Sequence, residues 1–306
     1  MLINLIWLIC GFIFLIRGAD YFIDGAAALA GRARMSAMMV GLTVVAMGTS
    51  LPELAICITS ALNDTSAIAV GNVIGSNVGN ILFILGVLSL IMPLTVRRRT
   101  ISYDAPFTLC VIALLYYIVL HYGVLSRMWA GVLLGLFACY LVYLFLMAHY
   151  NPQKPDKIKN ISVIKIVLYI VLGLIAIIMG SDLIVKSATS IAEHIGVSNR
   201  IIGLTIVALG TSLPELVTGI VALRKNQPDI AVGNIVGSSI FNMLFVLGVG
   251  GMVAPLHFEK MFLFDLVISA VAISMLILSS FQTMRLSRLS GVLFLMIYAL
   301  YILHII

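Results

Sequence analysis

Charged residues are scarce in this chain. Lys, Arg, Asp and Glu make up 10% of its 306 residues, whereas hydrophobic residues make up 62%. A soluble protein carries roughly 25% charged residues, so the composition excludes a soluble globular fold and indicates an integral membrane protein. The net charge of +6 is spread over short loops, whereas nucleic-acid binding requires a basic patch on a soluble face. We therefore expect the lipid bilayer as a partner and no nucleic acid.

Motifs for soft metals, redox chemistry and nucleophilic catalysis are also missing. The four cysteines lie in apolar segments without CxxC spacing, and the five histidines share no spacing. Thiol and imidazole ligands are therefore not expected, and no histidine is placed to act as a base for a nucleophile. The sequence predicts no prosthetic group and no enzymatic activity.

Apolar runs, in contrast, are abundant and long enough for membrane helices, which need about 20 residues to cross a hydrocarbon core of about 30 Å. We predict ten spans, at residues 2–19, 36–62, 66–93, 104–122, 127–148, 163–185, 198–223, 229–254, 261–281 and 288–305. The connections after the odd-numbered spans hold 14 of the 18 Lys and Arg residues. Because cytoplasmic loops are enriched in these residues, we expect both termini outside the cytoplasm.

The two halves of the chain repeat one another at an offset of 162 residues. Residues 41–54 (GLTVVAMGTSLPEL) and 203–216 (GLTIVALGTSLPEL) are identical at 12 of 14 positions, and residues 69–87 and 231–249 at 12 of 19. Each half holds five predicted spans, an odd number, so the copies should cross the membrane in opposite directions. Transporters built from such inverted repeats have ion sites near the midplane.

The predicted fold is therefore an all-α polytopic membrane protein of ten helices in two inverted repeats. Its predicted parts are a first five-helix repeat (1–150), a cytoplasmic linker (151–162) and a second, inverted five-helix repeat (163–306). Since the duplication would build a complete site within one chain, we expect the monomer to be functional.

Each repeat places a glutamate in an apolar span, Glu53 in the first and Glu215 in the second. A carboxylate is expensive in a bilayer and marks a functional site by default. Proline directly precedes both glutamates, and because proline lacks an amide hydrogen it leaves a carbonyl one turn earlier without its partner. Carboxylate, hydroxyl and carbonyl oxygens within one turn suit a hard cation. The hydroxyls near the two breaks are those of Thr49, Ser50, Thr211 and Ser212, and nearby carbonyls include those of Gly48, Gly210, Ala46 and Ala208.

A second pair of segments supplies hydroxyl and amide groups. Ser76 and Asn80 lie four residues apart and share a helix face, as do Ser238 and Asn242. We expect these four side chains to be ion ligands, the alternative being hydrogen bonds between helices. Asn72 and Asn234 lie one turn earlier.

Other carboxylates have simpler interpretations. Asp20 and Asp182 are matched in the repeat and are predicted near the ends of their helices, either as interface anchors or at an ion entrance. The two span glutamates could instead pair with a lysine at a proline kink. We do not favour that alternative, because neither core segment contains Lys or Arg.

At these residues the chain resembles the cation/calcium antiporter superfamily, and specifically the compact prokaryotic sodium/calcium exchangers. The resemblance is carried by GTSLPE at 48–53 and 210–215, GNVIGS at 71–76 and GNIVGS at 233–238. It implies exchange of Ca²⁺ for Na⁺ by alternating access in a prokaryotic inner or plasma membrane, with spans 1 and 6 sliding across the rest. The ion-site residues that it implies are Glu53, Glu215, Ser76, Ser238, Thr49, Ser50, Thr211, Ser212, Asn80 and the backbone of Ala46 and Ala208.

The chain departs from the family at one pair of positions. Sodium/calcium exchangers commonly carry a further carboxylate at a position matching Asn80 or Asn242, and both are Asn here. Two glutamates neutralise one Ca²⁺, two Na⁺ or two protons, whereas a third Na⁺ would add an uncompensated buried charge. We therefore expect about two monovalent ions per Ca²⁺, carried by Na⁺ or alternatively by H⁺. A cation channel is the alternative from another class, but it would need a continuous pore, usually built by oligomer symmetry.

Overall fold

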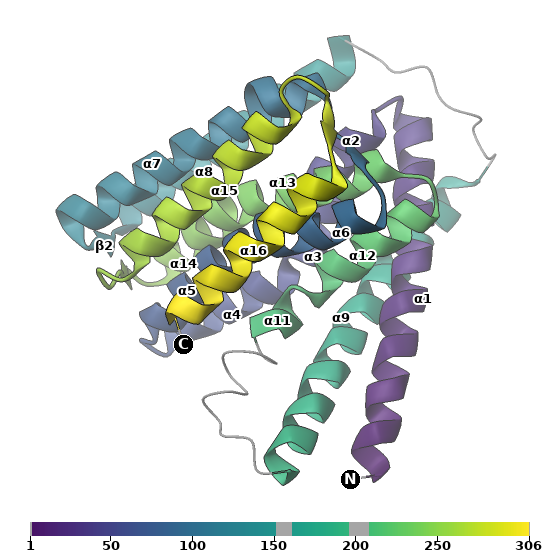
Figure 1. The fold of residues 1–306 in the computed structure, drawn as a ribbon, viewed down its shortest axis with the longest axis horizontal. Helices are drawn as coiled ribbons and strands as arrows, with labels where there is room; N and C mark the ends of the chain where they lie inside the picture. The colour runs from purple at the N-terminus through teal and green to yellow at the C-terminus, as the bar shows by residue number, and fades with distance from the viewer. Residues whose placement is uncertain (1, 151–160, 196–207, 306) are drawn as a thin grey trace.

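The protein is a bundle of helices (Figure 1), and the computed structural model describes residues 2–150, 161–195 and 208–305. The helices of the first half, with η for π-helical segments, are α1 (Leu2–Ala33), α2 (Ala37–Val40), η1 (Gly41–Val45), α3 (Ala46–Thr49), α4 (Leu51–Leu62), α5 (Ser66–Val78), η2 (Gly79–Ile84), α6 (Leu85–Ile91), η3 (Thr100–Asp104), α7 (Ala105–Tyr122) and α8 (Arg127–Tyr150). Those of the second half are α9 (Val163–His194), α11 (Ala208–Thr211), α12 (Leu213–Arg224), α13 (Pro228–Phe241), η5 (Asn242–Val246), α14 (Leu247–Val253), α15 (Phe262–Ser280) and α16 (Arg288–Ile305). The short strands are β1 (Leu94–Thr95), β2 (Val124–Leu125), β3 (Leu256–His257) and β4 (Arg285–Leu286).

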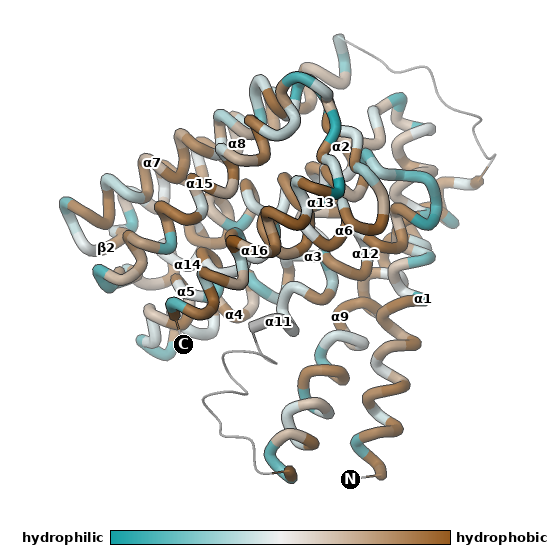
Figure 2. The backbone as a smooth tube through the Cα atoms, viewed as in Figure 1, coloured by the Kyte–Doolittle hydropathy of each residue, from teal (hydrophilic) through white to brown (hydrophobic). Residues whose placement is uncertain are grey.

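Most of the predicted membrane spans are present as long apolar helices. Within the described ranges, eight helical stretches are long and apolar enough to cross a bilayer, and Ala37–Thr49 with Leu51–Leu62, bent by 45°, makes a ninth. The predicted span 198–223 falls partly, and the predicted linker 151–162 largely, on residues outside the description. Figure 2 shows the apolar residues along the outer helices and the polar ones mainly at the turns between helices.

The predicted ends of the first and sixth spans are wrong. We expected spans at 2–19 and 163–185, but helices α1 and α9 run further and are each 32 residues long. The Ala-rich stretch after Asp20 favours a helix, although its polar residues make it less apolar than a span. Asp20 and Asp182 therefore lie inside long helices and not near their ends.

Helices α1 and α9 lie side by side and extend beyond the rest of the bundle (Figure 1). They pack backbone to backbone through glycines. A Cβ atom added to Gly18 would lie 2.8 Å from the carbonyl oxygen of Gly173, and one added to Gly180 would lie 2.7 Å from that of Gly11. Small residues of this kind let membrane helices approach closely, and a larger side chain would separate them.

The centre of the bundle is formed by α13–α14 and by α5–α6. Of the most apolar window of residues 228–253, 94% is buried inside the protein, compared with 22% for α1. The backbones of η1 and α13 are in close contact, since a Cβ atom on Gly41 would lie 2.7 Å from the carbonyl oxygen of Ile230. Polar side chains on these central helices are therefore kept away from lipid.

Equivalent elements of the two halves exchange partners. Strand β1 pairs with β4, and its equivalent β3 pairs with β2, both antiparallel. Tyr140 donates a hydrogen bond to Asp104 at 3.2 Å, and Tyr301 donates one to Asp265 at the same distance. These later equivalents lie 161 residues apart, so a comparison at the single offset of 162 missed them.

Candidate ion-binding site

Glu53 and Glu215 occupy equivalent places in the two halves. Each lies in the first turn of a helix, α4 or α12, directly after a proline. Proline is tolerated at a helix start because that amide has no helical partner, and the positive end of the helix dipole favours a carboxylate there. Both glutamates are fully buried. No ion pair within the described part of the chain involves either of them, so the lysine-paired alternative has no support there.

The two glutamates share one polar cluster. The hydroxyl of Ser50, from the first half, donates a hydrogen bond to Oε1 of Glu215, from the second half, at 3.0 Å. The charges of Glu53 and Glu215 are close enough to repel one another, and Ser76 is the hydroxyl that neighbours Glu53. Thr49 and Ser50 thus lie beside the glutamate of the other repeat.

Several buried oxygens of this cluster lack a hydrogen-bond donor. Within the described ranges, neither carboxylate oxygen of Glu53 meets hydrogen-bond geometry, nor does Oε2 of Glu215. The side-chain amides of Asn80 and Asn242, 1% and 0% exposed, are also unpaired. An unsatisfied buried polar group costs about 1–3 kcal/mol, so this concentration of oxygens points to a positively charged ligand.

The two asparagines open π-helical segments. Asn80 is the second residue of η2 and Asn242 is the first of η5. Segment η2 packs against α12, and η5 packs against α4, so each asparagine-bearing segment contacts the glutamate-bearing helix of the other half. Short π-helical segments inside α-helices occur frequently at functional sites. The sequence predicted the residues but not this widening of the helices.

The backbone at the breaks is better satisfied than the proline argument predicted. The carbonyl of Ala46 accepts the amide hydrogen of Ser50 at 3.1 Å, with the Ser238 hydroxyl 3.5 Å away. The carbonyl of Gly210 accepts a hydrogen bond at 2.9 Å from Ser181 of α9. The carbonyl that the proline leaves free in the second half is therefore paired with a hydroxyl of the long helix α9.

The remaining predicted residues lie at the second break. Thr211 ends α11 and is partly buried, and Ser212, 8% exposed, forms the turn into α12. Ala208 is the first residue of α11, and its side chain lies outside the description.

Two further polar residues complete the cluster. Thr49 donates to Oδ1 of Asn234 at 3.0 Å, and the Asn234 amide donates to Thr218 at 3.1 Å. Asn234 is recognisable as the repeat partner of Asn72. Thr218 matches an isoleucine in the first half, so the repeat gave no signal for it.

The ligand set is poor in charge. No group of three or more His, Cys, Asp or Glu residues able to hold a metal occurs in the part of the chain that the structure describes. Two carboxylates with neutral hydroxyl and amide oxygens suit a hard, transported cation better than a permanently bound soft metal.

A helical membrane bundle with two carboxylates buried where its halves meet is typical of a membrane transporter of small cations. The family profile described as sodium/calcium exchanger protein matches residues 3–146 and 165–306. The chain therefore belongs to the sodium/calcium exchanger family, and it is a cation/calcium antiporter of the prokaryotic type.

Relatives and solved structures agree with this assignment. The sodium/calcium exchanger MaX1 of Methanosarcina acetivorans is 31% identical, covering 98% of this chain and 97% of its own. The putative antiporter CaxA of Alkalimonas amylolytica is 39% identical, covering 83% of this chain and 82% of its own. A structure of the sodium-calcium exchanger NCX_Mj is 30% identical, with a TM-score of 0.87 over 100% of this chain and 99% of that chain. These relatives are transporters, in agreement with the expectation that the chain is not an enzyme.

Proposed function

We propose that the protein exchanges Ca²⁺ for Na⁺, and that both ions bind in turn to Glu53 and Glu215. The hydrogen bond from Ser50 to Glu215 carries this proposal, because it joins the glutamate helix of one half to the break of the other. The printed names of MaX1 and NCX_Mj support Na⁺ as the monovalent ion. The further proposed ligands are Thr49, Thr211, Ser212, Ser76, Ser238, Asn80, Asn242 and the backbone of Ala46 and Ala208.

The charge of the site sets the proposed stoichiometry. Two glutamates balance one Ca²⁺ or two monovalent ions, and the asparagines at 80 and 242 add no charge. A third Na⁺ would be an uncompensated charge in a low-dielectric interior. Exchange of two monovalent ions for one Ca²⁺ carries no net charge across the membrane.

Alternating access would use the two long helices. Helices α1 and α9 pack closely on each other and extend beyond the bundle, so they are the elements best placed to move relative to the glutamate helices. A neutralised site would allow their apolar surfaces to slide, whereas an empty, doubly negative site would resist it.

The wider organisation belongs to the same proposal. We infer ten spans in two inverted repeats, 1–150 and 163–306, joined by a cytoplasmic linker at 151–162, with both termini outside and one chain as the working unit. The exchange of strand partners between the halves supports the repeat. The concentration of basic residues after the odd-numbered spans supports the orientation.

Flux of ⁴⁵Ca²⁺ in proteoliposomes under separate Na⁺ and H⁺ gradients tests this function. We expect saturable Ca²⁺ uptake driven by Na⁺ on the opposite side, unaffected by clamping the membrane voltage. Uptake driven by H⁺ without Na⁺ would make the protein a Ca²⁺/H⁺ antiporter. Strong current during Na⁺-driven uptake would contradict the neutral stoichiometry, and non-saturating flux without counter-ion dependence would indicate a channel.

A further inference from the structure

Lys225 ties the long helix α1 to the helix that carries Glu215. It directly follows α12. Its Nζ lies 2.8 Å from Oδ2 of Asp24 and 3.7 Å from Oδ1 of Asp20, and it donates to the carbonyl oxygen of Asp20 at 2.8 Å. The Lys225 side chain is only 25% exposed. One ammonium group therefore holds two successive turns of α1 against the end of the glutamate helix.

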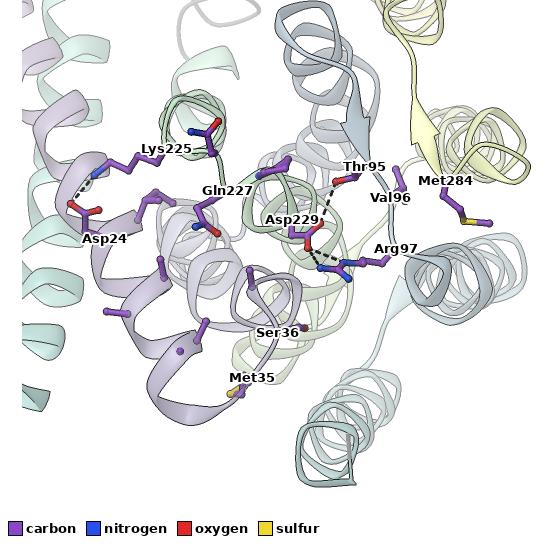
Figure 3. A pocket seen from close by; sticks show the side chains of 18 of the residues that line it. Asp24, Met35, Ser36, Thr95, Val96, Arg97, Lys225, Gln227, Asp229 and Met284 are labelled. Atoms are coloured by element: carbon purple, nitrogen blue, oxygen red, sulfur yellow. Dashed lines mark hydrogen bonds and ion pairs between the residues drawn. The ribbon is translucent and has the colours of Figure 1, made fainter. Parts of the chain in front are cut away.

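This contact lies in the wall of a large cavity (Figure 3). The cavity, of about 1650 Å³, is lined by Asp24 and Lys225 on one side and by the Arg97–Asp229 ion pair on the other. None of the candidate ion ligands lines it. Because Arg98 and Arg285 also line it, we call this end of the molecule the basic face. Among the described residues the cavity and the candidate ion ligands are therefore separate, and the Lys225 contact fastens α1 at the cavity wall.

Within the described ranges, the other half lacks the equivalent contact. At the repeat offset Lys225 is replaced by Asn63, which directly follows α4, and Asp24 is replaced by Lys186. Lys186 pairs instead within α9, with Asp182 at 2.8 Å, and both side chains are more than half exposed. Among the described residues no hydrogen bond or ion pair joins Asn63 to α9. The two long helices are thus held differently, although the halves are otherwise closely matched.

We propose that Lys225 is a positioning residue that latches α1 at the basic face and biases the transporter toward the conformation closed to the cavity. The inference rests on the proposed alternating access. Movement of α1 past α12 breaks the latch in each cycle, whereas movement of α9 past α4 breaks no equivalent contact among the described residues. The latch therefore makes the two access states unequal in energy.

Lys225→Asn, which installs the residue found in the other half, tests the latch. In vesicles that hold the protein in a single orientation, the half-saturating Ca²⁺ concentration can be measured separately at each face of the protein. A partly buried ion pair of this kind should bias the two states by about 2- to 5-fold. Loss of the ion pair should therefore lower the half-saturating Ca²⁺ concentration at the basic face and raise it at the opposite face. The reason is that a ligand binds more tightly when the conformation competent to bind it is more populated.

Lys186→Asn is the matched control, since it removes the same charge from an exposed pair within α9 and should leave both faces unchanged. Lys225→Arg should behave like the wild type, and Lys225→Asp combined with Asp24→Lys should restore it. Unchanged half-saturation in Lys225→Asn, or a shift of the same sign at both faces, would overturn the latch while leaving exchange intact. A wild-type protein without counter-ion-dependent flux would overturn both the latch and the proposed function.

Discussion

Replacing Glu53 with Gln is the most direct test of the ion site, because the two side chains share a shape and differ by one charge. Glu53 is fully buried, and neither of its oxygens is paired with a described residue. In the variant, Ca²⁺ would be balanced by Glu215 alone. An uncompensated buried charge costs about 3–5 kcal/mol, which corresponds to a loss of roughly 150- to 5,000-fold in Ca²⁺ affinity.

Calorimetry of the detergent-solubilised protein measures this affinity, and ⁴⁵Ca²⁺ exchange in proteoliposomes measures its consequence for transport. Exchange should be lost at Ca²⁺ concentrations that saturate the wild type. The ion-free variant should also melt at a higher temperature than the ion-free wild type, because it no longer has to bury the Glu53 carboxylate close to that of Glu215. Ca²⁺ should then add little to its stability.

Asp182→Asn is the matched control, because it removes a carboxylate that is 54% exposed and lies on α9. It should leave Ca²⁺ affinity unchanged. If Glu53→Gln bound Ca²⁺ within 10-fold of the wild type and still exchanged it, Glu53 would not be a ligand and the site would have to be built elsewhere. A lower melting temperature of the ion-free variant would instead mean that Glu53 stabilises the fold, and would contradict the argument from charge.

Asn242→Asp should bind cations more tightly and make exchange generate a current. With a third carboxylate, Ca²⁺ alone no longer balances the negative charge of the site. Uptake of a voltage-sensitive dye measures the current, and exchange without current would contradict this prediction. Gly173→Ala should lower the melting temperature and slow exchange, because its Cβ would lie 2.7 Å from the amide nitrogen of Phe22 and 2.8 Å from the carbonyl oxygen of Gly18. Overpacking of this kind costs about 1–3 kcal/mol. Gly75→Ala, whose Cβ would have no atom of a packed neighbour within 4 Å, is the control, and equal effects of the two would refute close packing of α1 and α9.

Local chemistry could be predicted from the sequence where a single segment determines it. The bend at Ser50 follows from Pro52, and the burial of Asn80 and Asn242 follows from their place in apolar runs. The lengths of α1 and α9 could not be predicted in this way. Hydropathy ends a span at its first polar turn, whereas a helix continues as long as its backbone hydrogen bonds and its packing against a neighbour permit.

Contacts between the halves were less accessible to prediction. The hydrogen bond from Thr49 to Asn234 joins residues of different halves, and the second offset of 161 residues lies beyond the strongest repeats. The asymmetry at Lys225 emerges only when its partners on α1 are known. Such contacts depend on which helix faces which, and that is decided by packing across most of the chain length.

The sequence by itself determined that the protein is embedded in a bilayer and that Glu53 and Glu215 mark a functional site. Few charged residues overall, and a carboxylate within an apolar span, carry these implications whatever the fold. Only the tertiary structure decided that Ser50 reaches Glu215 across the two halves, and that Lys225 fastens α1 while no described residue makes the equivalent contact to α9. Hydrogen bonds and ion pairs act over a few ångströms, and residues more than 150 positions apart come within that range only when the helices have packed.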